Sequence, residues 1–203
     1  MGCKFEKKCP VYKELLVCNG DFLDRNYGLA CDKNFCLNGE YKVKVNLGCG
    51  HNSVPGFINV DLRKLPGVDK VMDLNKKWKF NNNSIDFIYA RGVVEHLYSI
   101  DKTMEEIYRV LKPKGIAFLV LPYYNSIMMS YDPQHRWFFN ENTLNAYTYN
   151  FHLNYYSKAR FKLRKIIMIR QTKVSRLIPR FIRLPISRMI GNIYGEMAFI
   201  LEK

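Results

Sequence analysis

The chain of 203 residues lacks any long uninterrupted apolar run. Its apolar stretches are short and broken by charged residues, so no segment qualifies as a membrane-spanning helix. The first residues, Met1-Gly2-Cys3-Lys4, do not lead into the apolar stretch that a secretory signal needs. We therefore expect a cytoplasmic protein without a transmembrane segment.

Two nucleotide-binding signatures are also missing. No Gly-Lys-Ser/Thr follows a glycine loop, which excludes a P-loop. The turn at residues 48–53 has the sequence GCGHNS, so it lacks the third glycine of the dinucleotide fingerprint. Gly48 and Asp61 are separated by 13 residues, fewer than the roughly 20 that NAD-binding units use. A ligand that carries a ribose but no pyrophosphate fits this spacing better.

The stretch VNLGCGHNSVPGFINVD, residues 45–61, indicates where such a ligand would bind. An apolar run leads into Gly48-Cys49-Gly50, and a second apolar run ends at Asp61. Glycines after a strand allow a ligand to approach the backbone closely. An acid at the end of the next strand can accept hydrogen bonds from both hydroxyls of a ribose. The stretch therefore predicts a nucleoside-binding crevice at the carboxyl edge of a sheet.

Hydrophobic patterning predicts an α/β fold. We expect one helix at residues 100–111, with Asp101 as its N-cap, because its apolar positions recur on one face. The expected strands are 41–47, 57–60, 70–72, 84–90, 116–121, 161–170 and 196–201. This order predicts an open, Rossmann-like, mostly parallel seven-stranded sheet with helices on both faces.

The chain divides into two regions by composition. Residues 1–40 form a cysteine-rich segment, and residues 41–203 form the α/β domain. Within that domain, residues 123–150 are rich in aromatic side chains and are predicted to form a lid, whereas residues 158–190 form a basic region.

Three motifs resemble class I S-adenosylmethionine-dependent methyltransferases, in particular the small-molecule, type 11-like branch. They are VNLGCGHNSVPGFINVD, NNSIDFIYARGVVEHL and MEEIYRVLKPKGIAFLVLP, and together they cover about residues 43–124. The resemblance implies methyl transfer from S-adenosylmethionine. The implied cofactor-binding residues are Asn46, Gly48, Cys49, Gly50, Asp61, Leu62, Asp73, Leu74, Ala90 and Arg91.

The resemblance also implies individual roles. Gly48 and Gly50 would pass under the amino-acid part of the cofactor, and Asp61 would hold the ribose. Asp73 would lie near the adenine amino group, with Leu74 against the ring. Asn46 replaces the acid that the family often carries on its first strand, which weakens the expected grip on the cofactor's amino group.

Other residues of the motifs and of the lid are expected at the methyl-transfer end. Ala90 and Arg91 would line the methionine end of the cofactor, with Glu95 and His96 at the rim. As catalytic candidates on the acceptor side we take His135 as base, Arg136 as a holder of an anionic substrate, and Tyr123. We expect Trp137 and Phe138 of the same segment to belong to the core.

Five of the six cysteines fall in the first 36 residues. Clustering without a secretory signal favours metal binding over disulfides. Four thiolates would complete the tetrahedral shell of zinc, and the candidate ligands are Cys9, Cys18, Cys31 and Cys36. An iron–sulfur cluster uses the same ligands, and free buried thiols are the third alternative.

Charge is unevenly distributed along the chain. Residues 151–203 carry twelve Lys and Arg against two Asp and Glu, which contributes +10 of the total of +14. This asymmetry favours an anionic partner, either RNA or phospholipid, at the basic region. The acceptor therefore stays open between RNA and an anionic metabolite, lipid or glycan precursor. The alternative function is a non-catalytic nucleoside- or nucleic-acid-binding protein with the same fold.

Overall fold

A computed structural model describes residues 41–203 except 150, 153, 171–174 and 176. The predicted metal ligands Cys9, Cys18, Cys31 and Cys36 lie outside the described residues.

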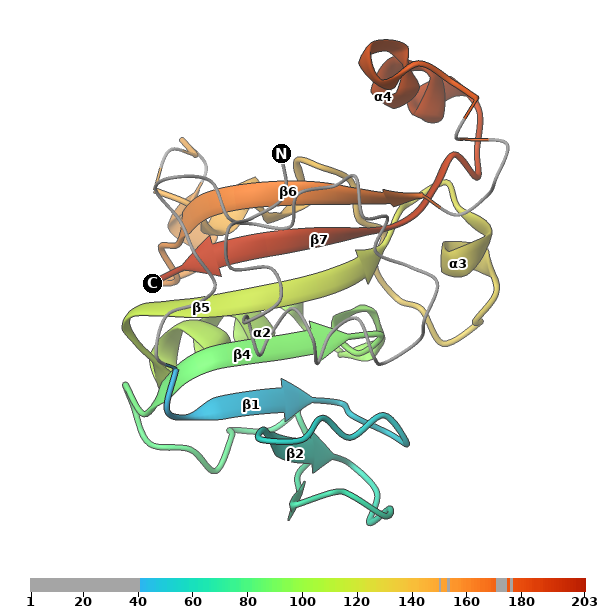
Figure 1. Ribbon diagram of the computed structural model, residues 1–203. Coiled ribbons are helices and arrows are strands. Elements are labelled where there is room, and N and C mark those ends of the chain that lie inside the picture. Colours follow the sequence, from blue (N-terminus) through green and yellow to red (C-terminus); the bar gives the residue numbers. More distant parts are fainter. Residues whose placement is uncertain (1–40, 150, 153, 171–174, 176) are drawn as a thin grey trace.

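The domain is built on one seven-stranded sheet (Figure 1). Its strands are β1 (Lys44–Leu47), β2 (Ile58–Asp61), β3 (Lys70–Val71), β4 (Ile85–Arg91), β5 (Leu111–Pro122), β6 (Lys162–Arg170) and β7 (Tyr194–Glu202). Their order is β3-β2-β1-β4-β5-β7-β6. Neighbours from β3 to β5 pair in parallel, whereas β7 runs antiparallel to β5 and β6. The predicted mostly parallel Rossmann-like sheet is thus confirmed.

The helices within the described residues are short. They are α2 (Ile100–Val110), α3 (Ile127–Ser130), α4 (Arg180–Met189), and the 3-10 helices η1 (Val94–His96), η2 (Thr143–Tyr147) and η3 (Asn154–Tyr156). The link from β1 to β2 is a turn and not a helix. α4 lies at one end of the domain (Figure 1), where its Leu184 and Ile186 pack against the core cluster. No helix among the described residues is long and apolar enough to cross a membrane.

The prediction that Asp101 caps α2 is wrong. Ser99 is the N-cap, and its hydroxyl accepts a hydrogen bond from the Lys102 N–H at 3.3 Å. Asp101 lies within the first turn, where an acid still favours the positive end of the helix dipole. Its carboxylate accepts a hydrogen bond of 2.7 Å from the Tyr147 hydroxyl, which ties η2 to α2.

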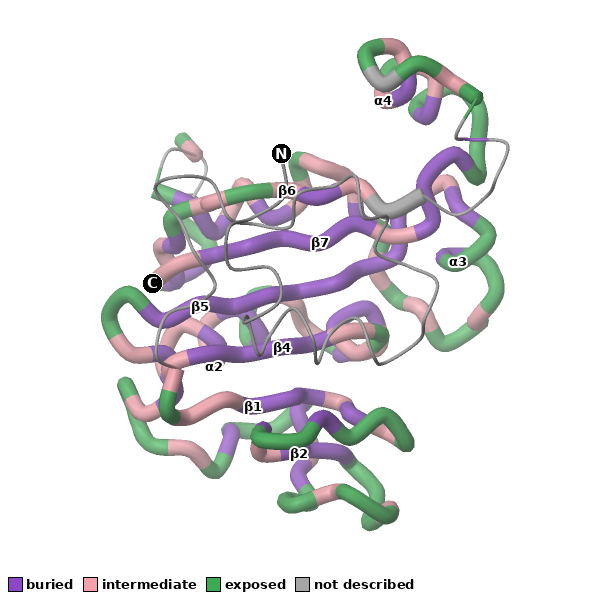
Figure 2. The backbone as a smooth tube through the Cα atoms, viewed as in Figure 1, coloured by how far each residue is buried: buried purple, intermediate pink, exposed green. Residues whose placement is uncertain are grey.

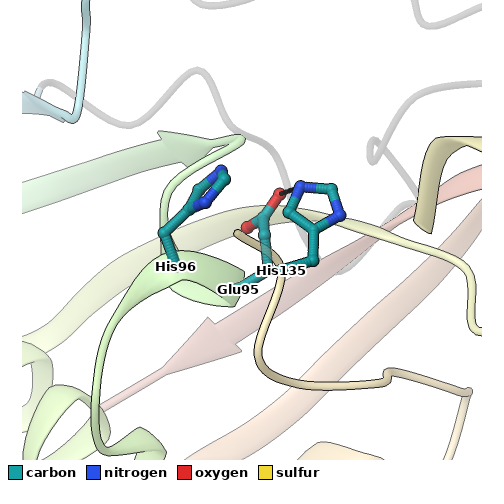
Figure 3. A group of neighbouring side chains, drawn as sticks. All are labelled: Glu95, His96 and His135. Atoms are coloured by element: carbon teal, nitrogen blue, oxygen red, sulfur yellow. Dashed lines mark ion pairs between the residues drawn. The ribbon is translucent and has the colours of Figure 1, made fainter. Parts of the chain in front are cut away.

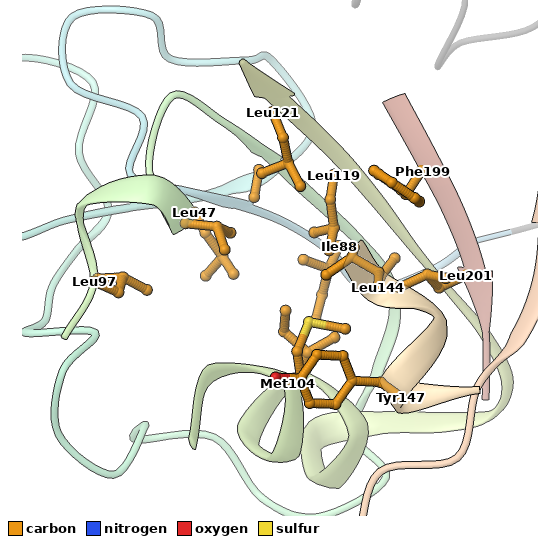
Figure 4. Close-up of a cluster of buried hydrophobic side chains, with 14 of the residues drawn as sticks. Leu47, Ile88, Leu97, Met104, Leu119, Leu121, Leu144, Tyr147, Phe199 and Leu201 are labelled. Atoms are coloured by element: carbon orange, nitrogen blue, oxygen red, sulfur yellow. The ribbon is translucent and has the colours of Figure 1, made fainter. Parts of the chain in front are cut away.

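The central strands are buried along their length (Figure 2), and their apolar side chains belong to two core clusters, one on each face of the sheet. Alternation along β5 separates the faces: Leu119 and Leu121 belong to the core cluster with Met104 of α2 (Figure 4), whereas Phe118 belongs to the cluster on the opposite face. A wholly apolar strand is what two covered faces require.

The candidate site lies where the strand order changes direction beside β1. From β1 the chain moves outward through β2 and β3, then returns to β4 and β5 on the other side. In an open α/β sheet, ligands bind in the crevice that this reversal opens beyond the carboxyl ends of the strands. The turn after β1 and the loop after β4 both reach that crevice.

Candidate cofactor pocket and acceptor site

The turn after β1 depends on glycine. Gly48 and Gly50 have φ values of 60° and 50°, a left-handed region that other residues rarely adopt. At Gly48 a Cβ atom would lie 2.4 Å from Cγ2 of Val93, in the loop after β4. Absence of a side chain at residue 48 therefore allows the turn to pack against that loop.

Asp61 holds the same turn from the end of β2. Its Oδ2 accepts a hydrogen bond of 2.8 Å from the Gly50 N–H, and its Oδ1 accepts one of 3.0 Å from the Arg63 N–H. The residue is only 8 % exposed. A carboxylate offers about four acceptor positions, so two remain for a ligand's hydroxyls.

Asn46 lies in β1 just before the turn, and Cys49 belongs to the turn itself. The Asn46 amide donates to Oδ1 of Asn59 at 3.0 Å and to the carbonyl of Asn52 at 3.1 Å. Burial, assisted by the nearby Asp61 carboxylate, raises the pKa of the Cys49 thiol. Both side chains are buried and support the turn from inside the protein, a role that the sequence motif did not reveal.

A cavity of about 610 Å³ opens between the glycine turn and the segment after β5. It is lined by Gly48, Asp61, Leu62, Met72, Asp73, Leu74, Asn75, Val93, His96, Leu97, Tyr98, Pro133, Gln134, His135 and Arg136. Five of the predicted cofactor residues and two of the predicted acceptor residues therefore share one cavity.

The residues expected near adenine, Asp73 and Leu74, line the cavity. Asp73 accepts a hydrogen bond of 2.9 Å from the Asn75 N–H and pairs with Lys76 at 3.6 Å. The Asn75 backbone hydrogen bond, despite opposing desolvation, keeps the pKa of Asp73 below its ordinary value. Leu74 is buried, whereas Leu62 is 63 % exposed and offers an apolar surface at the mouth.

Six predicted residues do not line this cavity: Asn46, Cys49 and Gly50, described above, and Ala90, Arg91 and Tyr123. Ala90 is fully buried within β4. Arg91 pairs with Glu196 of β7 through two hydrogen bonds of 3.1 and 2.8 Å, a two-pronged contact between the carboxyl end of β4 and β7. Tyr123 is fully buried, and its hydroxyl donates to Glu141 at 3.4 Å.

The segment after β5 returns to η1 and brings His135 to the cavity. The Arg136 N–H donates to the carbonyl of Glu95 at 2.9 Å, and Nε1 of Trp137 donates to the carbonyl of Leu97 at 2.7 Å. The guanidinium of Arg136 lies 4.6 Å from the ring centre of Tyr98. Phe138, expected in the core, is 67 % exposed, because the segment is anchored by Trp137 instead.

Glu95, His96 and His135 form a cluster at the cavity's edge (Figure 3). Nε2 of His135 lies 3.9 Å from Oε1 of Glu95, and the two imidazole ring centres are 4.7 Å apart. Burial raises the pKa of Glu95 to about 7, and burial lowers the pKa of His96. The sequence placed Glu95 and His96 at the rim but gave no signal that His135, 39 residues away, would join them.

Comparison with known proteins finds a matching domain family and similar folds. Residues 46–119 match the family model of a methyltransferase domain, and no curated protein matches the sequence. A methyltransferase structure from Archaeoglobus fulgidus is similar, with a TM-score of 0.59 and 17 % identity over 81 % of this chain and 87 % of that one. One from Methanosarcina mazei has a TM-score of 0.52 and 15 % identity over 79 % and 91 %.

The cyclase SpnF has the same fold, with a TM-score of 0.52 and 14 % identity over 79 % of this chain and 74 % of that one. At such identities these structures establish the fold alone. The motif-bearing half of the sheet, from β1 through β5, supplies the family match. The methyltransferase-domain match is confined to residues 46–119, and the described fold is the one that these S-adenosylmethionine-dependent methyltransferase structures have.

Proposed function

We propose that this chain transfers the methyl group of S-adenosylmethionine to an acceptor that binds beside His135 and Arg136. The observation that carries the proposal is the shared cavity: Gly48 and Asp61 stand on one wall, and His135 and Arg136 stand on another. The cofactor's adenosine would lie over Asp61 towards Asp73, which directs its sulfonium end towards the two histidines.

Methyl transfer depends mainly on the alignment of the acceptor with the cofactor. A methyl group on positively charged sulfur is already activated, so positioning of the acceptor atom in line with the carbon–sulfur bond dominates the rate. A base is needed only if the acceptor holds its proton near neutral pH. In the absence of a bound ion, His135 is the group for that task, because its Nδ1 donates to the Met129 carbonyl at 2.9 Å and its Nε2 is free to accept.

The acceptor we favour is an anionic small molecule, a metabolite or a lipid or glycan precursor. Arg136 lines the cavity and rests on the exposed ring of Tyr98. A guanidinium held in this way can bind a carboxylate or phosphate with two parallel hydrogen bonds. RNA is the competing acceptor, supported by the basic region at residues 158–190. We further propose a cytoplasmic location and zinc binding by Cys9, Cys18, Cys31 and Cys36.

Binding and transfer can be tested separately. Calorimetry with S-adenosylhomocysteine should show binding to the full chain and binding at least about 10-fold weaker to Asp61→Asn, because an amide replaces one ribose acceptor with a donor. Asp101→Asn is the matched control, since its amide oxygen can still accept from Tyr147 outside the cavity.

Transfer is then measured with methyl-labelled cofactor and fractionated cell extract. Label in a small-molecule fraction supports the favoured acceptor, and label in RNA supports the competing one. Cofactor binding with no transfer to any fraction would favour the non-catalytic alternative, and equal cofactor affinity in both variants would refute the assignment of the pocket.

A further inference from the structure

Two buried polar atoms in the Glu95–His96–His135 cluster have no hydrogen-bond partner among the described residues. They are Oε2 of Glu95 and Nδ1 of His96. Glu95 is only 2 % exposed. Leaving such an atom unpaired costs about 1–3 kcal/mol, and native proteins contain few of them. Two such atoms in adjacent residues of one cluster indicate a missing ligand.

The third member offers a matching atom. His135 Nδ1 lies 2.9 Å from the Met129 carbonyl oxygen, which can only accept, so Nδ1 carries the hydrogen and the lone pair of the neutral ring is on Nε2. Metal-binding histidines commonly donate their other ring N–H to a backbone carbonyl in this way. The cluster thus presents one carboxylate oxygen and two imidazole nitrogens.

We propose that Glu95, His96 and His135 bind a divalent transition-metal ion. Imidazole and carboxylate together suit zinc, iron, manganese and their neighbours better than magnesium or calcium, which prefer oxygen alone. The three ligand atoms lie within 4.8 Å of one another. Bonds of about 2.0–2.1 Å in a tetrahedral shell would place them roughly 3.4 Å apart, a contraction that side-chain rotation can supply.

Surrounding charge also favours a cation. The carboxylates of Asp132 and Glu196 both act on Glu95 through space. Arg136 opposes a cation, since its charge acts on His96. Glu196 is paired with Arg91, but the carboxylates of Glu95 and Asp132 still outnumber the Arg136 guanidinium, which is also held over the Tyr98 ring.

Three protein ligands leave coordination positions open, as in catalytic metal sites. His96 and His135 both line the cavity, so the open positions would face the acceptor. This consequence rests on the proposed function: the ion would hold an acceptor oxygen and lower the pKa of an acceptor hydroxyl. His135 would then act as a ligand and not as a free base. Metal binding itself does not depend on methyl transfer.

The test uses the full chain after removal of metal by a chelator, with Mn²⁺ as the probe. Mn²⁺ favours nitrogen and oxygen ligands over thiolates, so the cysteine cluster should contribute little. The electron paramagnetic resonance signal of free Mn²⁺ falls as the ion binds. We expect one ion per chain, with affinity reduced at least about 10-fold, the lower end of what outer-shell changes cost, in Glu95→Gln and in His96→Asn.

His152→Asn is the matched control, because His152 is exposed and lies outside the cluster. Its affinity for Mn²⁺ should equal that of the unaltered chain, and circular dichroism should show that all three variants are folded. Absence of Mn²⁺ binding, or equal affinity in all variants, would overturn the metal site. If S-adenosylhomocysteine still binds in that case, the proposed function survives; if Mn²⁺ binds but S-adenosylhomocysteine does not, the metal site survives without it.

Discussion

Substitution of alanine for each of the two glycines in the turn after β1 should have unequal effects. Both residues have positive φ, 60° at Gly48 and 50° at Gly50. An added Cβ at Gly50 would meet no atom within 4 Å. At Gly48 it would lie 2.4 Å from Cγ2 and 2.6 Å from Cβ of Val93. Alanine at residue 50 therefore adds backbone strain alone, whereas alanine at residue 48 adds backbone strain and a steric clash.

The expected magnitudes follow from these contacts. A left-handed backbone costs a residue with a side chain about 1–2 kcal/mol, and this cost applies to both variants. Overpacking typically adds about 1–3 kcal/mol, and it applies to Gly48→Ala alone. Because Cβ of Val93 is itself too close, rotation of that side chain cannot remove the clash. We expect losses of about 2–5 kcal/mol for Gly48→Ala and about 1–2 kcal/mol for Gly50→Ala.

Urea unfolding followed by circular dichroism measures both free energies of unfolding, provided that the slopes with denaturant agree. Loss of stability in Gly50→Ala equal to or greater than that in Gly48→Ala would refute the packing argument. It would mean that the turn does not press against the loop after β4 as described.

Two further substitutions test charge networks around the sheet. Asp86 accepts hydrogen bonds from the Val43 N–H and from Lys112. Burial would raise the pKa of Asp86, but these contacts outweigh it and lower the pKa. Asp86→Asn should therefore lower the free energy of unfolding by about 1 kcal/mol at neutral pH. The difference in free energy of unfolding between the two proteins should shrink as the pH falls below about 3.9, the ordinary pKa of aspartate, because protonation of Asp86 weakens its contacts in the folded state. A constant difference in urea titrations down to pH 2 would contradict this prediction. Arg91→Lys should lose the two-pronged contact with Glu196 and lower the free energy of unfolding by about 1–2 kcal/mol. Its affinity for S-adenosylhomocysteine should change less than about two-fold, since Arg91 does not line the cavity, and a larger change by calorimetry would place Arg91 at the cofactor.

Much of the sheet could be predicted because its signals are local. Strand β5 is apolar on both faces and β1 is followed by two glycines, so both the buried strand and the crevice follow from neighbouring residues. The start of α2 depends on geometry: Ser99 and Asp101 are both good caps, and only the backbone conformation at Ser99 decides between them.

The acceptor side depends on contacts between distant segments. Glu95 and His135 meet because the chain after β5 folds back onto η1, and no periodicity or spacing encodes that return. The same holds for Tyr123, whose hydroxyl donates to Glu141, 18 residues further along the chain. The Asn46 amide donates to Asn59, a contact that the motif does not reveal.

A crystal structure of the full chain with S-adenosylhomocysteine tests the central claim most directly. We expect the ribose hydroxyls on the Asp61 carboxylate, the adenine beside Asp73 and Leu74, and the sulfur directed towards His135. Density for the ligand elsewhere on the protein, or an empty pocket at saturating ligand, would contradict it.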